Sequence, residues 1–160
     1  MKIGVISDTH IPLVCERLPE KIKEHFKGVD MILHAGDMID MSVIDALREI
    51  APNVEAVRGN MDSLKIQQTL PEKKIISAGK YKIGLIHGWG APQDIMERLE
   101  REFKDVDIIV FGHTHSPINI RQNNVLFFNP GSPTDTVHAK ELTIGILELN
   151  GKPKGRIIKL

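Results

Sequence analysis

Five short apolar runs in this chain each end, within a few residues, in side chains that can bind a metal ion. The residues that follow the runs are Asp8-Thr9-His10, Gly36-Asp37, Gly59-Asn60, His87 and Gly112-His113-Thr114-His115. Continuous apolar runs of this length are typical of strands buried on both faces, as in largely parallel sheets covered by helices. The carboxyl ends of such strands meet in one crevice. We therefore expect seven oxygen and nitrogen donors to converge at one edge of an α/β sheet.

The segments between these runs carry helical periodicity. We expect helices over Pro19 to Phe26, about Met41 to Ile50 and about Pro92 to Phe103, because apolar residues there recur at three- and four-residue spacing. Alternation of strands with helices favours helices packed on a largely parallel sheet. We expect the region from Leu64 to Pro71 to be a loop near the site.

Three further pairs of apolar runs have the pattern of β-hairpins. Their turns are Ala78-Gly79-Lys80, Gln122-Asn123-Asn124 and Asn150-Gly151. Antiparallel pairs of this kind extend one sheet or build a second. The chain shows no repeat, low-complexity segment or linker that divides it, so we expect a single domain over residues 1–160.

Charge and cysteine content narrow the range of partners. The 160 residues carry 21 basic and 21 acidic side chains, which leaves no excess charge to hold duplex DNA, and we do not expect long nucleic acid as a partner. The most basic stretch, Lys152 to Lys159, is typical of a solvated edge strand. A single cysteine, Cys15, excludes an internal disulfide and a thiolate metal cluster. No apolar run reaches the roughly 18 residues of a membrane helix, so we expect a cytoplasmic protein without membrane contact.

In order and in type, the five endings resemble the signature of the calcineurin-like metallophosphoesterases: D-x-H, G-D, G-N, H and G-H-x-H. The resemblance is closer to their small single-domain phosphodiesterase branch in bacteria and archaea, because the core ends with Asn129-Pro130-Gly131-Ser132 and no domain is inserted. It covers nearly the whole chain. The resemblance implies an α/β fold, specifically a four-layer α/β/β/α sandwich with two mixed β-sheets.

The resemblance also implies two divalent metal ions. The first would be held by Asp8, His10, Asp37 and His115, and the second by Asp37, Asn60, His87 and His113. Asp37 would bridge them, since a dinuclear site needs one carboxylate that shares its two oxygens between ions roughly 3.5–4 Å apart. Donors of nitrogen and oxygen without thiolate suit Mn²⁺, Fe²⁺, Co²⁺, Ni²⁺ or Zn²⁺ better than Ca²⁺, and the family favours Mn²⁺.

The function implied is hydrolysis of small phosphodiesters by in-line attack of a metal-bridging hydroxide, with no catalytic side chain beyond it. One departure from the wider family bears on this mechanism. Met61 stands where many members carry the histidine that protonates the leaving group. A thioether has no acidic proton, so we expect diesters with good leaving groups to be cleaved fastest. Two alternatives stay open, a phosphomonoesterase of the same fold and a non-catalytic scaffold similar to a eukaryotic retromer subunit.

Several other residues near the motifs have more than one interpretation. Asp62 is expected to orient a metal-binding histidine, with protonation of the leaving group or a turn or N-cap role as its alternatives. Asp40 is expected either to orient a histidine or to cap a turn. We expect His34 to be a core histidine and His138 to lie in a surface loop. Trp89 would stack a substrate ring, anchor a subunit interface or pack over its own loop. An exposed apolar sheet face or edge could support a homodimer.

Overall fold

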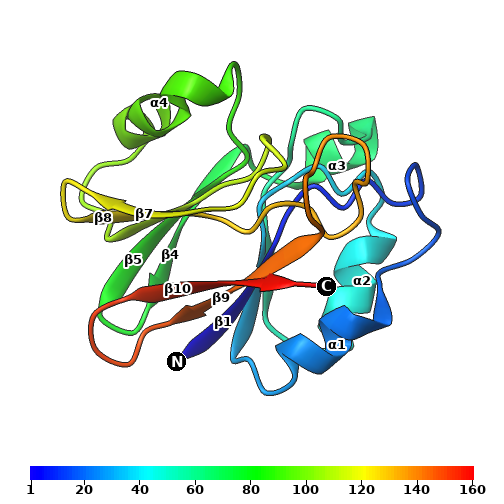
Figure 1. Ribbon diagram of the computed structural model, residues 1–160, viewed down its shortest axis with the longest axis horizontal. Helices are drawn as coiled ribbons and strands as arrows, with labels where there is room; N and C mark the ends of the chain where they lie inside the picture. The colour runs from blue at the N-terminus through cyan, green and yellow to red at the C-terminus, as the bar shows by residue number, and fades with distance from the viewer.

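Two five-stranded sheets pack against each other at the centre of the protein, in a computed structural model that describes residues 1–160 (Figure 1). The strand orders are β10-β9-β1-β2-β3 and β4-β5-β6-β8-β7. The first sheet consists of β1 (Lys2–Ile6), β2 (Met31–His34), β3 (Val54–Ala56), β9 (Thr143–Glu148) and β10 (Lys154–Lys159). The second consists of β4 (Lys73–Ala78), β5 (Tyr81–Ile86), β6 (Ile108–Val110), β7 (Ile118–Gln122) and β8 (Val125–Asn129).

Both sheets are mixed. In the first, β1, β2 and β3 run parallel, while β9 pairs antiparallel with β1 and with β10. In the second, β5, β6 and β8 run parallel between the antiparallel edge strands β4 and β7. The three predicted hairpins are therefore confirmed as β4-β5, β7-β8 and β9-β10. The basic tail forms β10, an edge strand, as expected.

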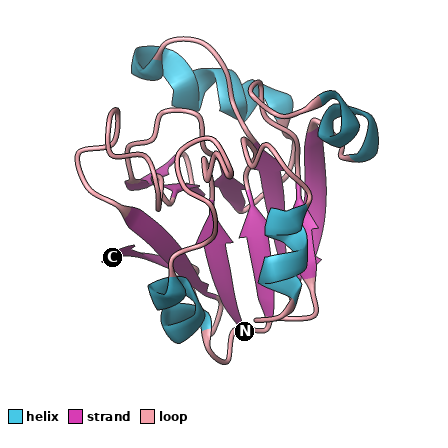
Figure 2. Cartoon of the chain, turned by 90° about the vertical axis from the view of Figure 1, so that its right-hand side faces the viewer, coloured by secondary structure: helices cyan, strands magenta, loops and turns pink.

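Helices cover the outer face of each sheet (Figures 1 and 2). Helices α1 (Glu20–Phe26) and α2 (Ser42–Arg48) bury their apolar faces, including Phe26 and Leu47, in a core shared with the first sheet. Helix α4 (Ile95–Glu102), which follows the short 3-10 helix η1 (Pro92–Asp94), buries Leu99 against the second sheet. A third core, with Val5, Leu33 and Leu85, fills the space between the sheets. The predicted α/β/β/α sandwich with two mixed sheets is confirmed.

The prediction of a loop from Leu64 to Pro71 is wrong. Residues Leu64–Thr69 form helix α3, which buries only Ile66 in the core of the first sheet. A six-residue helix with a single buried apolar side chain has no periodicity to detect, because a periodic pattern needs at least two turns. None of the helices is long and apolar enough to cross a membrane.

The two sheets meet where their parallel strands end, and this junction builds the candidate site. After β2, the Ala35 carbonyl accepts a 2.7 Å hydrogen bond from the ring of His87, which follows β5 in the other sheet. After β6, the backbone N–H of His113 donates to the carboxylate of Asp8, which follows β1, at 3.1 and 3.2 Å. Loops from both sheets therefore interlock at one end of the sandwich.

Candidate metal centre

The seven predicted metal-binding residues lie together between the two sheets. Their donor atoms form a continuous chain of contacts, each no longer than 3.9 Å. The contacts run His113 Nδ1 to Asn60 Oδ1 (3.1 Å), Asn60 Oδ1 to His87 Nε2 (3.2 Å), His87 Nε2 to Asp37 Oδ2 (3.2 Å), Asp37 Oδ2 to His10 Nε2 (3.9 Å), His10 Nε2 to His115 Nε2 (3.3 Å) and His115 Nε2 to Asp8 Oδ1 (3.3 Å). The structure thus brings every predicted donor to one place.

The loops that carry these side chains have unusual backbone geometry. Asp8, His10, Asp37, His113 and His115 adopt positive φ angles of 55°, 45°, 57°, 68° and 54°. Residues with a Cβ rarely adopt this conformation, which costs free energy unless neighbouring structure holds it. Strained backbone of this kind clusters at functional sites. Here it turns each strand end sharply, so that the side chain faces the junction of the sheets.

Glycines in the G-N and G-H-x-H motifs make room for the carboxylates. A Cβ on Gly59 would lie 2.1 Å from Oδ1 of Asp37, and a Cβ on Gly112 would lie 2.7 Å from Oδ2 of Asp8. Both distances are shorter than van der Waals contact. The glycine positions therefore allow neighbouring loops to pass directly behind the two buried carboxylates.

Three of the histidines have one ring nitrogen fixed by an acceptor outside the cluster. His87 donates from Nδ1 to the Ala35 carbonyl at 2.7 Å, and His113 donates from Nε2 to the Gly90 carbonyl at 3.1 Å. His115 donates from Nδ1 to the carboxylate of Asp135. Because these acceptors have no proton to give, the proton lies on the nitrogen away from the cluster in each neutral ring. The remaining nitrogen faces the cluster with a lone pair available for a metal ion.

The donor set fits divalent metal ions. For metal–nitrogen and metal–oxygen bonds of about 2.0–2.2 Å, two ligands of one ion lie roughly 3–3.5 Å apart, and Nε2 of His10 and Nε2 of His115 are 3.3 Å apart. Two overlapping groups of the predicted ligands have their donor atoms within 4.8 Å of one another: Asp8, His10 and His115, and Asp8, Asp37 and His87; a third such group joins His115 to Asp135 and His138. Asp8 belongs to both groups, whereas the family pattern assigns it only to the first ion.

Asp37 offers one oxygen to this cluster rather than two. Its Oδ1 accepts a 2.7 Å hydrogen bond from the backbone N–H of Met61. Its Oδ2 lies 3.2 Å from Nε2 of His87 and 3.9 Å from Nε2 of His10. Oδ1 is thus bound by the Met61 N–H, and Oδ2 is the oxygen that faces the imidazoles of His87 and His10.

Buried charges shift the pKa values of the cluster. Hydrogen bonding to Asp8, with a further contribution from Asp135, raises the pKa of His115 to about 9 despite partial burial. Burial opposes charge on His87 and Asp37, but their mutual hydrogen bond and attraction raise the pKa of His87 and lower the pKa of Asp37. In the absence of metal, the carboxylates thus favour the protonated forms of His115 and His87, and a bound cation would take the place of these protons.

Asp62 and Asp40 both bind backbone N–H groups. Asp62 does not orient a histidine: it accepts hydrogen bonds from the backbone N–H groups of Asp37, Ile39 and Gly59, at 3.0, 2.7 and 2.7 Å. It ties together the loops after β2 and β3. Asp40 is exposed and caps a turn by accepting from the N–H of Ser42 at 2.9 Å, the simpler of its two interpretations.

Asp135 takes the role that was predicted for Asp62. It lies in the loop after β8, is buried, and binds Nδ1 of His115 through Oδ2. The same oxygen lies 2.9 Å from Nδ1 of His138, which is exposed as expected. Sequence reasoning missed Asp135 because it stands 20 residues from His115 and belongs to no motif. The only available signal was its position in the loop that follows Asn129-Pro130-Gly131-Ser132.

His34 and Cys15 are not part of the cluster. The ring of His34 is fully buried, accepts from the N–H of Gly36 at 3.1 Å, and bonds Oγ1 of Thr9 at 3.1 Å. Burial lowers the pKa of His34 to about 4, so it is a neutral core histidine, as predicted. Burial raises the pKa of the Cys15 thiol, which donates to the Arg17 carbonyl and is therefore not an activated nucleophile.

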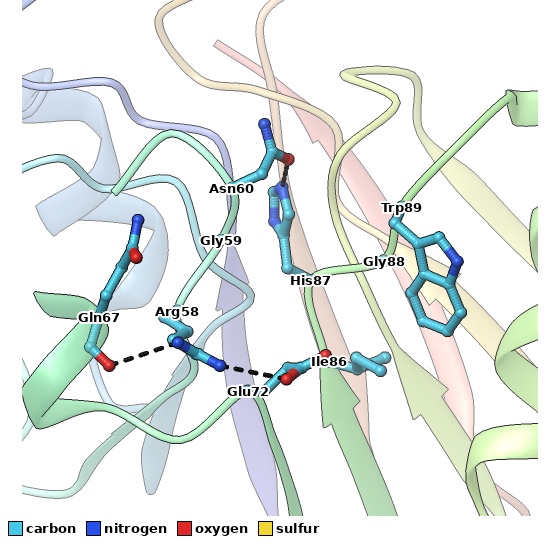
Figure 3. A pocket seen from close by; sticks show the side chains of 9 residues that line it. All are labelled: Arg58, Gly59, Asn60, Gln67, Glu72, Ile86, His87, Gly88 and Trp89. Atoms are coloured by element: carbon cyan, nitrogen blue, oxygen red, sulfur yellow. Dashed lines mark hydrogen bonds and ion pairs between the residues drawn. The ribbon is translucent and has the colours of Figure 1, made fainter. Parts of the chain in front are cut away.

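A pocket with a volume of about 280 Å³ opens beside the cluster (Figure 3). Asn60 and His87 form the wall that it shares with the metal-binding residues. Arg58 and Gln67 lie on one side of His87, and Trp89 lies on the other. The pocket is lined by Arg58, Gly59, Asn60, Gln67, Glu72, Ile86, His87, Gly88 and Trp89.

Comparison with known proteins agrees with this geometry. Residues 1–152 match the calcineurin-like phosphoesterase superfamily domain. A probable metallophosphoesterase of Methanocaldococcus jannaschii is 41% identical over 137 residues, which cover 84% of this chain and 69% of the relative. The chain belongs to the calcineurin-like phosphoesterase superfamily, a class of divalent-metal-dependent hydrolases of phosphate esters, and it has candidate metal-binding groups of its own.

Solved structures with the same fold have two different descriptions. One, described as a novel archaeal phosphodiesterase, superposes with a TM-score of 0.78 at 26% identity and covers 100% of both chains. Another is wild-type Vps29 of Entamoeba histolytica in complex with Zn²⁺, with a TM-score of 0.77 at 27% identity over 99% of both chains. The fold and sequence likeness therefore extend to an enzyme and to a vacuolar sorting protein.

Proposed function

We propose that the protein is a phosphodiesterase that hydrolyses small phosphodiesters with two divalent ions, with Mn²⁺ preferred. The observation that carries this proposal is the position of Asp37 Oδ2, which faces His87 Nε2 at 3.2 Å and His10 Nε2 at 3.9 Å. A carboxylate that lies between imidazoles assigned to different ions could be shared by those ions. The solved archaeal phosphodiesterase of the same fold supports the choice of a diester.

The residues of the chain define how the site would work. When bound, the ions would activate a water molecule for attack on phosphorus and neutralise charge on the phosphate oxygens. His87, His113 and His115 have their outward ring nitrogens bound by acceptors, which fixes the orientation of the nitrogens that face the cluster, so little reorganisation accompanies the reaction. Nothing beyond the activated water is needed as a nucleophile.

Residue 61 is a methionine, whose side chain cannot protonate the leaving group. Met61 is 53% exposed, and its backbone N–H donates a hydrogen bond to Asp37. Substrates that leave as stable anions, such as aryl esters, therefore suit the site better than alkyl esters. This restriction follows from the Gly59-Asn60-Met61-Asp62 segment itself.

The test compares turnover of bis(p-nitrophenyl) phosphate and p-nitrophenyl phosphate, before and after chelation, with metal content measured by elemental analysis. We expect two ions per chain, faster turnover of the diester, loss of activity on chelation and best recovery with Mn²⁺. His10→Ala should lose activity, while His25→Ala, a histidine on α1 outside the cluster, should not. Faster turnover of the monoester would assign a phosphomonoesterase instead.

A scaffold is the second candidate, because Vps29 proteins share the fold at 26–27% identity. A scaffold would use the protein surface and would need no turnover. The Vps29 complex with Zn²⁺ shows that metal binding alone does not separate the two candidates. Absence of hydrolysis of every diester tested, in protein shown to contain metal, would favour the scaffold.

A further inference from the structure

The charges that line the pocket next to the metal cluster indicate what kind of group it can bind. Nη2 of Arg58 pairs with the Glu72 carboxylate at 3.1 Å, and Nη1 donates to the Gln67 carbonyl at 3.4 Å. The guanidinium charge is thus balanced within the pocket, and no other arginine and no lysine lines it. A second phosphate would find no unpaired arginine or lysine there. The pocket suits an uncharged group.

Gln67 and Arg58 give this pocket hydrogen-bonding capacity for such a group. The side-chain Nε2 of Gln67 donates to the Asp62 carbonyl at 2.8 Å, which fixes the amide and leaves its oxygen available as an acceptor. Arg58, with 34% of its side chain exposed, presents donors nearby. Acceptors and donors on fixed side chains favour a planar polar ring over an alkyl group.

Trp89 is held at the border of the pocket by its backbone rather than by its ring. Nη2 of Arg98, on α4, donates to the Trp89 carbonyl at 3.0 Å and to the Ala91 carbonyl. The next carbonyl, of Gly90, accepts from Nε2 of His113 at 3.1 Å. Despite these anchors, Trp89 remains 40% exposed. The backbone around Trp89 is thus anchored, and the partly exposed indole of this pocket-lining residue offers a stacking surface.

We propose that this pocket binds an aromatic ring of nucleobase size, carried by one ester arm of the substrate, with Trp89 as the stacking residue. The inference rests on the proposed function, which places the phosphate at the metal cluster next to Asn60 and His87. The volume of about 280 Å³ holds one such ring with its sugar. The preferred substrates are thus nucleoside or aryl esters rather than small aliphatic diesters.

The chain contains one tryptophan, so its fluorescence reports on this pocket alone. The probes are adenosine 5′-monophosphate and ribose 5-phosphate, which share phosphate and ribose and differ in the base, titrated into protein loaded with Zn²⁺. We expect the nucleotide to change Trp89 fluorescence and to bind about tenfold more tightly than ribose 5-phosphate, the size of effect that one stacked base gives. Equal affinities, or no change in fluorescence with the nucleotide, would overturn the inference.

Substitutions of Trp89 test whether the ring binds the base by stacking or only supports the structure of the pocket. By calorimetry, Trp89→Ala should weaken nucleotide binding about tenfold and Trp89→Phe by less, with ribose 5-phosphate unaffected in both. Ile120→Ala, an exposed apolar residue on β7 outside the pocket, is the matched control and should change neither affinity. Equal weakening of both probes by Trp89→Ala contradicts the stacking role.

The outcome also separates this inference from the proposed function. Diester hydrolysis without base-dependent binding contradicts the pocket assignment alone. Base-dependent binding without hydrolysis of any diester supports the pocket and contradicts the diesterase proposal.

Discussion

Oδ2 of Asp135 hydrogen-bonds Nδ1 of His115, whose other ring nitrogen, Nε2, lies 3.3 Å from Oδ1 of Asp8. The carboxylate thereby fixes which nitrogen of His115 carries the proton and which is free for a metal ion. This contact comes from a loop that contributes no donor of its own to the seven-residue cluster. Metal affinity should therefore depend on Asp135 as well as on the residues that would bind the ions directly.

Replacing Asp135 with Asn should weaken metal binding about 10- to 100-fold, the usual effect of removing a carboxylate behind a metal-binding histidine. An amide N–H₂ facing Nδ1 would favour the wrong tautomer of His115, with a proton on Nε2. The measurement is metal affinity by competition with a chelating dye. Asp40→Asn makes the same chemical change at an exposed turn and should leave the affinity unchanged. Equal affinities for Asp135→Asn and wild type would contradict this role.

Asp62 should contribute to the free energy of unfolding rather than orient a metal-binding histidine. Replacing it with Ala leaves three backbone N–H groups, of Asp37, Ile39 and Gly59, without their carboxylate acceptor. We expect the free energy of unfolding of the metal-free protein to fall by about 3 kcal/mol, as for loss of hydrogen bonds to a buried charge. Denaturant titration with chelator present measures this. Asp40→Ala, which removes one exposed bond, should cost less than about 1 kcal/mol, and a similar loss for both variants would refute the assignment.

The sequence predicts the convergence of these side chains because each lies within five residues of the end of the strand that positions it. Asp8 follows β1 and His87 follows β5, so a run of apolar residues and the next polar residue suffice to place them. The carboxyl ends of parallel strands converge by geometry alone. The same locality makes the three hairpins predictable from their turns.

The features that the sequence did not predict depend on contacts between distant segments. Asp135 acts on His115 from another loop, and Oδ1 of Asp37 is turned away by the Met61 N–H, 24 residues further along the chain. Helix α3 is stabilised through one buried side chain, Ile66. None of these has a local pattern, because each depends on which loops meet at the end of the sandwich.

Metal binding should release protons below about pH 9. Hydrogen bonding to Asp8 raises the pKa of His115 to about 9, so the metal-free residue is protonated at neutral pH. An ion that binds Nε2 must displace this proton, so apparent metal affinity falls as pH falls below about 9 and levels off above it. Calorimetry in buffers of different ionisation enthalpy measures the protons released. An affinity that does not change between about pH 7 and 9 would contradict the shift.

Restoring a proton donor at position 61 should widen the range of substrates. Met61 is 53% exposed and contacts Asp37 only through its backbone N–H, so Met61→His keeps that contact and costs little stability. For aryl diesters with leaving phenols of different pKa, we expect wild-type kcat to fall steeply as that pKa rises. Met61→His should flatten this dependence and raise kcat for the poorest leaving group at least about tenfold, since a placed general acid contributes roughly 10²–10⁴-fold. Met61→Gln, which is polar but not acidic, should behave like wild type. A wild-type rate that is already independent of leaving-group pKa would show that another group in the site supplies the proton.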